Sequence, residues 1–154
     1  MYMKRILVIL TTTLITLAGC GKEKGITSSN NVPHYNEVEE LHIEWNDLFN
    51  QNNDSYYAYV YSVTCTPCSM LREQVTSFSK GNYVNFYFVF PNDDIPFISD
   101  ENTADASLGK NNINDVYIYN TPTLIGITNK TITSYSRDYY EIKSFIESYT
   151  NGEN

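Results

Sequence analysis

The sequence predicts an α/β fold, because a strand, an amphipathic helix and a second strand follow one another near its middle. The run 56–63 is β-branched and aromatic on both alternating faces, which is typical of a strand covered by helices on both sides. After Cys68 the apolar residues take up helical spacing, and this helix is expected to end near residues 80–81. The run 83–90 is again strongly apolar and predicts a strand. Strand, helix and strand in this order imply a right-handed parallel crossover.

Another helix is predicted upstream, over residues 36–49. Its apolar residues form one stripe at helical spacing, and its acidic residues lie mostly on the other face. The stripe consists of Val38, Leu41, Trp45, Leu48 and Phe49. Because Trp45 falls on this stripe, we expect it to be a core residue.

A hairpin and a last helix are predicted near the end of the chain. A strand that runs through Ile127 is followed by a turn at residues 129–130 and a returning strand over 131–135. Asp138, with Glu141 three residues later, resembles a capping box that opens a helix. The apolar stripe of that helix is Ile142, Phe145, Ile146 and Tyr149.

The segment 91–115 is expected to be a solvated surface insertion with a short helix over about 103–110. It is rich in aspartate and glutamate, but their spacing does not match an EF-hand calcium loop. We therefore do not predict a calcium site there.

The most informative motif is a pair of cysteines, Cys65-Thr66-Pro67-Cys68. It lies at the predicted turn from strand to helix, so Cys65 is expected at a helix N-terminus. There, free backbone N–H groups and the helix dipole lower the pKa of a thiol. Pro67 fits the same geometry, since proline is tolerated in a first helical turn. We interpret the pair as a redox-active dithiol.

The cysteine pair has two other interpretations. A structural zinc site needs four ligands at recognisable spacings, and the chain has no second cysteine pair and only two histidines, His34 and His42. A purely stapling disulfide would close a very short loop, which stabilises a fold little. Thiol-disulfide exchange without a metal or another cofactor is the favoured interpretation.

The start of the chain predicts export and a lipid anchor. Positive charges at Lys4 and Arg5 precede an apolar run over 6–17 that is too short to span a bilayer, and small residues end it. The sequence Leu17-Ala18-Gly19-Cys20 resembles the bacterial lipobox, in which the cysteine is diacylated and becomes the mature N-terminus. Two acyl chains give stable membrane anchoring. If Cys20 carries lipid, the pair described above holds the only other thiols of the chain.

The predicted organisation is therefore a signal peptide over 1–19, a lipid-anchored flexible linker over 20–35 and one domain over 36–150. The precursor has 154 residues and a formal charge of −8, and removal of Lys4 and Arg5 with the signal brings the mature protein near −10. This acidity argues against nucleic acid and anionic lipid headgroups as partners.

Over residues 36–150 the chain resembles the thioredoxin-fold family, on its cysteine motif and on Thr121-Pro122-Thr123-Leu124, which is similar to the family's cis-proline segment. The resemblance implies a mixed central sheet flanked by helices, with Pro122 in a cis peptide bond facing the disulfide. It also implies that Cys65 is the attacking thiolate and Cys68 the resolving thiol. The groove for an extended substrate chain would be framed by Thr121, Pro122, Thr66 and Pro67.

The chain departs from thioredoxins proper at several positions. They have a tryptophan before the first cysteine and a buried acid six residues before it, where this chain has Thr64 and Tyr59. Gly-Pro between the cysteines is replaced by Thr66-Pro67, and the proline of the following helix by Glu73. The chain is more similar to exported, lipid-anchored thioredoxin-like proteins of Gram-positive bacteria, which include the bacteriocin-transport-accessory type.

Two functional hypotheses follow from the resemblance. The first is a monomeric thiol-disulfide oxidoreductase, lipid-anchored on the extracytoplasmic face, that acts on thiols and disulfides of exported proteins and exchanges electrons with a membrane redox partner. The second is a non-catalytic accessory lipoprotein with a static disulfide. Potentials in this fold span roughly −270 to −120 mV, so oxidation, reduction and isomerisation are all compatible with the first hypothesis.

The lipid anchor can be tested by a single substitution. We expect Cys20→Ser to release the protein from the membrane fraction, because the variant has no thiol to acylate. Fractionation of cells expressing either form, with detection by immunoblot, measures the effect. A variant that stays as firmly membrane-bound as the parent protein would contradict the lipobox interpretation.

Overall fold

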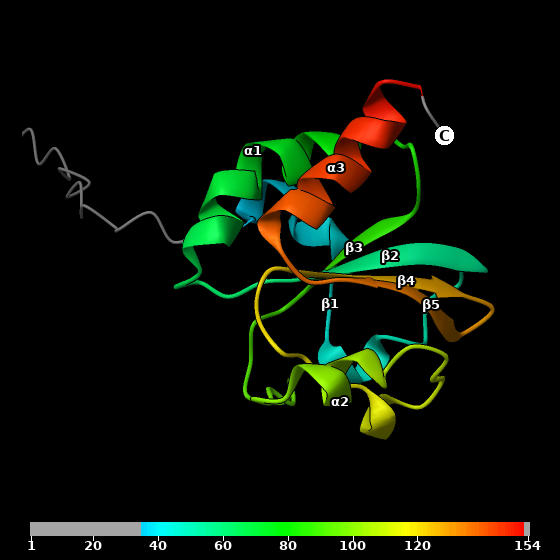
Figure 1. Cartoon of the computed structure of the whole chain (residues 1–154). Coiled ribbons are helices and arrows are strands. Elements are labelled where there is room, and N and C mark those ends of the chain that lie inside the picture. Colours follow the sequence, from blue (N-terminus) through cyan, green and yellow to red (C-terminus); the bar gives the residue numbers. More distant parts are fainter. Residues whose placement is uncertain (1–34, 153–154) are drawn as a thin grey trace, which may run out of the picture.

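The computed structural model describes residues 35–152 (Figure 1). The predicted signal peptide, Cys20 and the linker before Tyr35 lie outside these described residues. Between residues 35 and 152, no helix has the length and apolar character needed to cross a membrane.

Strand β2 (Ser55–Val60) is the middle of a five-stranded sheet with the order β1-β3-β2-β4-β5. It pairs in parallel with β3 (Phe86–Val89) and antiparallel with β4 (Thr123–Thr128). Beyond these, β1 (His42–Ile43) lies parallel to β3, and β5 (Thr131–Ser136) lies antiparallel to β4. The parallel crossover and the hairpin are both confirmed, and together they give the mixed sheet of the α/β thioredoxin fold.

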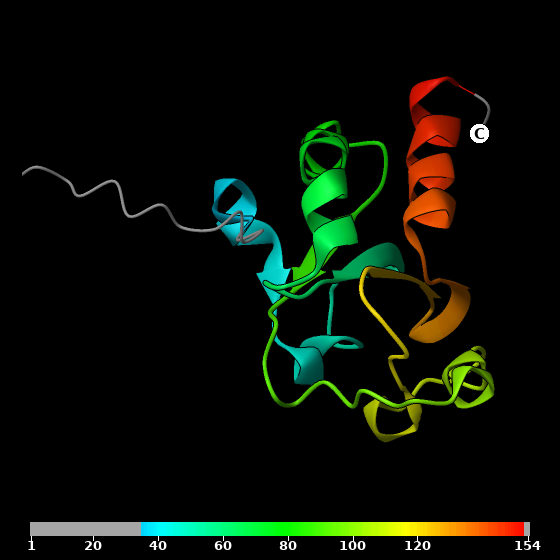
Figure 2. The same ribbon diagram turned by 60° about the vertical axis from the view of Figure 1, so that its left-hand side comes forward.

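Helices cover both faces of this sheet. Helices α1 (Thr66–Lys80) and α3 (Tyr139–Thr150) lie side by side on one face, and the short α2 (Glu101–Asp105) lies on the other (Figure 1, Figure 2). Strand β2 supplies both cores: Tyr59 packs into the cluster beneath α1 and α3, and Tyr56 packs into the opposite cluster. The strand is therefore buried on both sides, as its sequence predicts.

The prediction of one helix over residues 36–49 is wrong. The chain forms a 3-10 helix η1 (Asn36–Leu41), then β1, then a second 3-10 helix η2 (Trp45–Asp47). Val38 packs under α1 and α3, whereas Trp45 packs into the cluster on the opposite face of the sheet. A continuous helix would hold these side chains on one stripe. The chain instead forms β1, the edge strand of the sheet, between the two 3-10 helices. The expectation that Trp45 is a core residue is confirmed.

The local signals at the ends of the other elements are confirmed. Helix α1 ends at Lys80, and Asn129 and Lys130 form the tight turn with positive φ angles of 49° and 61°. At the start of α3, Asp138 Oδ1 accepts a hydrogen bond from the Glu141 N–H at 2.9 Å. Helix α2 lies within the predicted insertion but is shorter than the expected helix over about 103–110. Asp100 caps it, so it starts two residues earlier than expected, but it already ends at residue 105.

Gly126 gives a test of this packing, because it leaves no room for a side chain. A Cβ there would lie 2.1 Å from Ser134 Oγ and 2.9 Å from Tyr57 Cε1. We expect Gly126→Ala to lower the free energy of unfolding by about 1–3 kcal/mol through overpacking, measured by urea denaturation. In a Ser134→Ala background the loss should be smaller, since the nearest atom is gone. Equal losses in both backgrounds would contradict this explanation.

Candidate active site around Cys65 and Cys68

The two cysteines form a disulfide at the N-terminus of α1. Cys65 is the N-cap residue and is half-buried, whereas Cys68 lies in the first turn and is fully buried. The Cys68 N–H donates a hydrogen bond to Cys65 Sγ, with 3.1 Å between the two atoms. A negative charge on Cys65 Sγ would therefore be stabilised by this N–H group and by the helix dipole.

The loop before β4 brings Thr121 and Pro122 to the disulfide. The register of the sheet pairs Thr123, the first residue of β4, with Val60, the last residue of β2. The chain preceding Thr123 therefore lies beside the chain that leads to Cys65. Cys65 Sγ lies 3.2 Å from the carbonyl oxygen of Thr121, across 56 residues of sequence, and the Thr121-Pro122 bond is cis. The expected cis bond is present, and the residue before Pro122 contacts Cys65.

The other predicted groove residues also lie at this site. Thr66 is exposed and Pro67 is half-buried, and both belong to the first turn of α1 between the cysteines. Pro67 occupies the first helical turn as the sequence predicts. Their part in holding a substrate stays a prediction.

Beneath the disulfide lie two buried tyrosines. Tyr59 takes the place of the buried acid of thioredoxins, and its hydroxyl lies 3.2 Å from the hydroxyl of Tyr35. The Tyr35 hydroxyl also lies within hydrogen-bond distance, 3.0 Å, of the Cys68 carbonyl oxygen. Both hydrogen bonds are satisfied if Tyr59 donates to Tyr35 and Tyr35 donates to Cys68. Burial raises the pKa of both phenols well above the ordinary value, so both are neutral at physiological pH.

Tyr35 is the residue of this site that sequence reasoning missed. It lies in the segment predicted to be a linker, but its side chain is fully buried. The available signal was its spacing, because Tyr35 precedes Val38 by three residues and so extends the apolar stripe of that segment. Tyr35 thereby joins the beginning of the described chain to the first turn of α1.

The described residues do not place a metal site near the cysteines. From 35 to 152, no group of three or more His, Cys, Asp and Glu side chains is arranged to hold a metal ion. His42 is held by other groups, since Nδ1 lies 3.1 Å from the Val38 carbonyl oxygen and Nε2 lies 3.0 Å from the Tyr61 hydroxyl. Burial lowers the pKa of His42, so the neutral imidazole is favoured.

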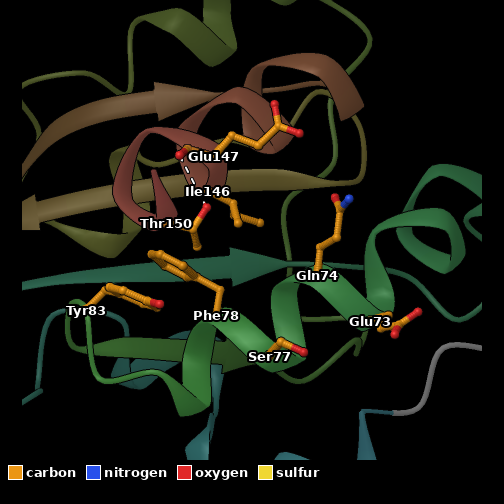
Figure 3. A pocket seen from close by; sticks show the side chains of 8 residues that line it. All are labelled: Glu73, Gln74, Ser77, Phe78, Tyr83, Ile146, Glu147 and Thr150. Atoms are coloured by element: carbon orange, nitrogen blue, oxygen red, sulfur yellow. Dashed lines mark hydrogen bonds between the residues drawn. The ribbon is translucent and has the colours of Figure 1, made fainter. Parts of the chain in front are cut away.

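A hollow of about 470 Å³ lies away from the disulfide, between α1 and α3 (Figure 3). Phe78 of α1 and Ile146 of α3 contribute apolar side chains to it, and Glu73 and Glu147 contribute carboxylates. Neither cysteine and neither residue of the Thr121-Pro122 loop lines this hollow. It is therefore not part of the redox site.

Comparisons with known proteins give structural matches only, since neither a family model nor a curated protein matches the chain. Thioredoxin f2 from Chlamydomonas reinhardtii is 16% identical, with a TM-score of 0.48, over 70% of this chain and 94% of that chain. Mitochondrial thioredoxin 3 from Saccharomyces cerevisiae, in its oxidised form, is 15% identical, with a TM-score of 0.47, over 74% and 97%. A mutant thioredoxin from Halobacterium salinarum is 25% identical, with a TM-score of 0.43, over 71% and 89%.

The topology and the site define the class of this protein. It has a thioredoxin fold, with a Cys-x-x-Cys disulfide at the N-terminus of α1 facing a cis-proline loop. At this coarse level its chemistry is that of a thiol-disulfide oxidoreductase.

The role of Tyr35 can be tested by removing its hydroxyl. We expect Tyr35→Phe to make alkylation of Cys68 in the reduced protein about fivefold faster or more. The reason is that the first turn of α1 loses a buried hydrogen bond and the Tyr59 hydroxyl loses its partner. Tyr56→Phe is the matched control, because the Tyr56 hydroxyl donates a buried hydrogen bond to the Leu48 carbonyl at 2.7 Å in the opposite cluster. Mass spectrometry of alkylated peptides gives the rate at each cysteine. Equal acceleration in both variants would show that overall stability, not the contact with Cys68, controls the rate.

Proposed function

We propose that this protein is a membrane-tethered thiol-disulfide oxidoreductase that acts on exported proteins at the extracytoplasmic face of the membrane. The observation that carries the chemistry is the position of Cys65. It is half-buried rather than closed off, it caps a helix, and its Sγ lies 3.2 Å from the Thr121 carbonyl oxygen. A stapling disulfide needs none of these features.

Oxidation of a substrate begins with the disulfide form. A substrate thiolate attacks Cys65 Sγ, the Cys65–Cys68 bond breaks, and Cys68 leaves as a thiolate that takes up a proton. A second substrate thiolate then attacks the substrate sulfur of the mixed disulfide and releases Cys65 as a thiolate. That thiolate accepts the hydrogen bond from the Cys68 N–H. Two electrons pass from the substrate to the protein, and the substrate gains a disulfide.

Reduction of a substrate runs through the same steps in reverse. The Cys65 thiolate attacks a substrate disulfide, and Cys68 must then lose its proton to displace the substrate from Cys65. Tyr35 and Tyr59 lie beneath Cys68 as neutral phenols, so neither is ready to accept this proton. We therefore expect resolution by Cys68 to be slow relative to attack by Cys65.

The backbone of Thr121 supports a polypeptide as the substrate. Its carbonyl lies beside Cys65 Sγ at the edge of the loop, and an extended segment can pair there as an added strand. Under this proposal, such pairing would bring a substrate cysteine to Cys65 Sγ.

The cellular setting is proposed from the sequence. The charged start, the short apolar run and the lipobox-like end at Cys20 support export and lipid anchoring. Under this proposal the protein is a monomer of the exported thioredoxin-like type found in Gram-positive bacteria, which includes bacteriocin-transport-accessory proteins. A membrane redox partner would return Cys65 and Cys68 to their starting state.

A redox titration of the purified domain tests the chemistry. We expect a reduction potential within the range of roughly −270 to −120 mV that catalytic members of this fold show. A potential below about −300 mV would favour the accessory-protein alternative, because structural disulfides typically lie there.

Alkylation of the reduced protein should be faster at Cys65 than at Cys68, since Cys68 is fully buried.

Trapping identifies the substrates of the same site. Cys68→Ser should accumulate mixed disulfides with exported proteins, because the thiol that releases them is absent. Cys65→Ser is the control and should trap little, since Cys68 is buried. The proposal would be contradicted by two slowly reacting thiols together with an absence of trapped partners.

A further inference from the structure

Two adjoining hollows lie next to the loop that leads into Cys65. Their volumes are about 260 and 200 Å³, and they share Tyr61, Val63 and Pro91 as lining residues. We call these two adjoining hollows together the Val63 groove, defined by these three residues together with Phe90 and Phe97.

The Val63 groove lies next to the redox site, although neither cysteine and neither Thr121 nor Pro122 lines it. Its wall includes Ser62, whose carbonyl accepts a hydrogen bond from the Cys65 N–H at 3.2 Å. On its other side, Phe97 forms a parallel bridge with Ile118, which lies three residues before Thr121. Figure 2 shows that the chain after β3 and the loop before β4 both leave the sheet near the end where α1 begins. The groove is therefore close enough to Cys65 for a polypeptide whose cysteine meets Cys65 to extend into it.

The floor of the groove and its surroundings are apolar but accessible. The exposed fractions of Phe97, Phe90 and Tyr119 are 51%, 38% and 38%, although all three are large hydrophobic side chains. Tyr119 lies two residues before Thr121, on the segment that pairs with the Phe97 segment. Exposed apolar side chains gathered beside a reactive centre are typical of a binding surface.

The charged side chains that line the groove are all negative. The charged residues that line the two hollows are Glu39 and Asp93, one in each, and no lysine or arginine lines either of them. Both carboxylates are exposed and so available to a partner. A second copy of this chain is a poor occupant, because its formal charge is −8 and like charges repel across an interface.

We propose that the Val63 groove selects the substrates of this site, a proposal that rests on the proposed function. The groove binds an extended cysteine-containing polypeptide with an aromatic or aliphatic residue next to the cysteine and lysine or arginine beyond it. The apolar side chain lies against Phe90 and Phe97, and the basic side chains lie near Glu39 and Asp93. Complementary charge accelerates encounter and excludes acidic segments, while the apolar contact provides affinity.

Two synthetic peptides test this specificity. Each has one cysteine, next to phenylalanine and activated as a mixed disulfide with thionitrobenzoate, and they differ only in carrying two lysines or two glutamates beyond it. Attack by reduced Cys65 on the peptide sulfur forms the protein–peptide mixed disulfide and releases thionitrobenzoate, which is followed by absorbance. We expect the lysine peptide to react about tenfold faster at low ionic strength, and we expect the ratio to fall in high salt.

Matched variants localise the effect to the groove. The double variant Glu39→Gln with Asp93→Asn should reduce the lysine-to-glutamate ratio to about threefold or less. The control is Glu73→Gln with Glu147→Gln, which removes the same charge from the hollow between α1 and α3 and should leave the ratio unchanged. Phe97→Ala should slow both peptides alike, whereas Leu108→Ala, which removes an equally exposed apolar side chain elsewhere, should slow neither.

Reaction with 2-hydroxyethyl disulfide, which is small and uncharged, separates failure of the groove from failure of the redox function. If the protein reduces this compound but shows no charge preference, or if the groove and control double variants change the ratio equally, the groove assignment is wrong and the proposed function stands. If the protein reduces neither this compound nor the peptides, the proposed function fails and the groove assignment fails with it.

Discussion

The pairing of β2 with β4 is the constraint on which the site depends. Because Val60 lies opposite Thr123, the segments that extend beyond the two strands are brought side by side. One of them continues to Cys65 and the other contains Thr121 and Pro122, so Cys65 Sγ comes within 3.2 Å of the Thr121 carbonyl oxygen. A shift of one residue in this register would turn every side chain of the strand to the other face, and the burial of β2 on both faces prevents it. The reactive geometry is therefore held by the most buried part of the sheet.

The same strand supplies the environment of Cys68. Tyr59 projects from β2 into the cluster beneath α1, where it meets Tyr35 and, through it, the carbonyl of Cys68. Neutral phenols are far better tolerated in a dry interior than an ionised carboxylate. A buried hydrogen-bonded pair of phenols therefore supports the first turn of α1 without offering a ready base.

The hollow between α1 and α3 and the Val63 groove differ in their distance from the reactive cysteines. The hollow between α1 and α3 has carboxylates and apolar side chains but no reactive group (Figure 3). The Val63 groove has a similar character, but it opens beside the loop that leads into Cys65. Proximity to Cys65 is the reason for assigning substrate selection to the Val63 groove and not to the hollow between α1 and α3.

Much of this protein was determined by local sequence patterns. Strand β2, helix α1, the turn at Asn129, the cap at Asp138 and the cysteine pair could all be predicted, because each depends on residues within a few positions of one another. The approach of the Thr121-Pro122 loop to Cys65 was expected only from resemblance to a family, since no local signal links segments 56 residues apart.

The tertiary structure alone decided where the apolar residues of the segment 36–49 go and what lies beneath Cys68. Val38 and Trp45 have helical spacing, but they are buried in clusters on opposite faces of the sheet. Tyr35 reaches Cys68 across 33 residues, and the Val63 groove is assembled from three separate segments of the chain. These features arise from contacts between distant residues once the sheet has formed, and the periodicity of a single segment does not encode them.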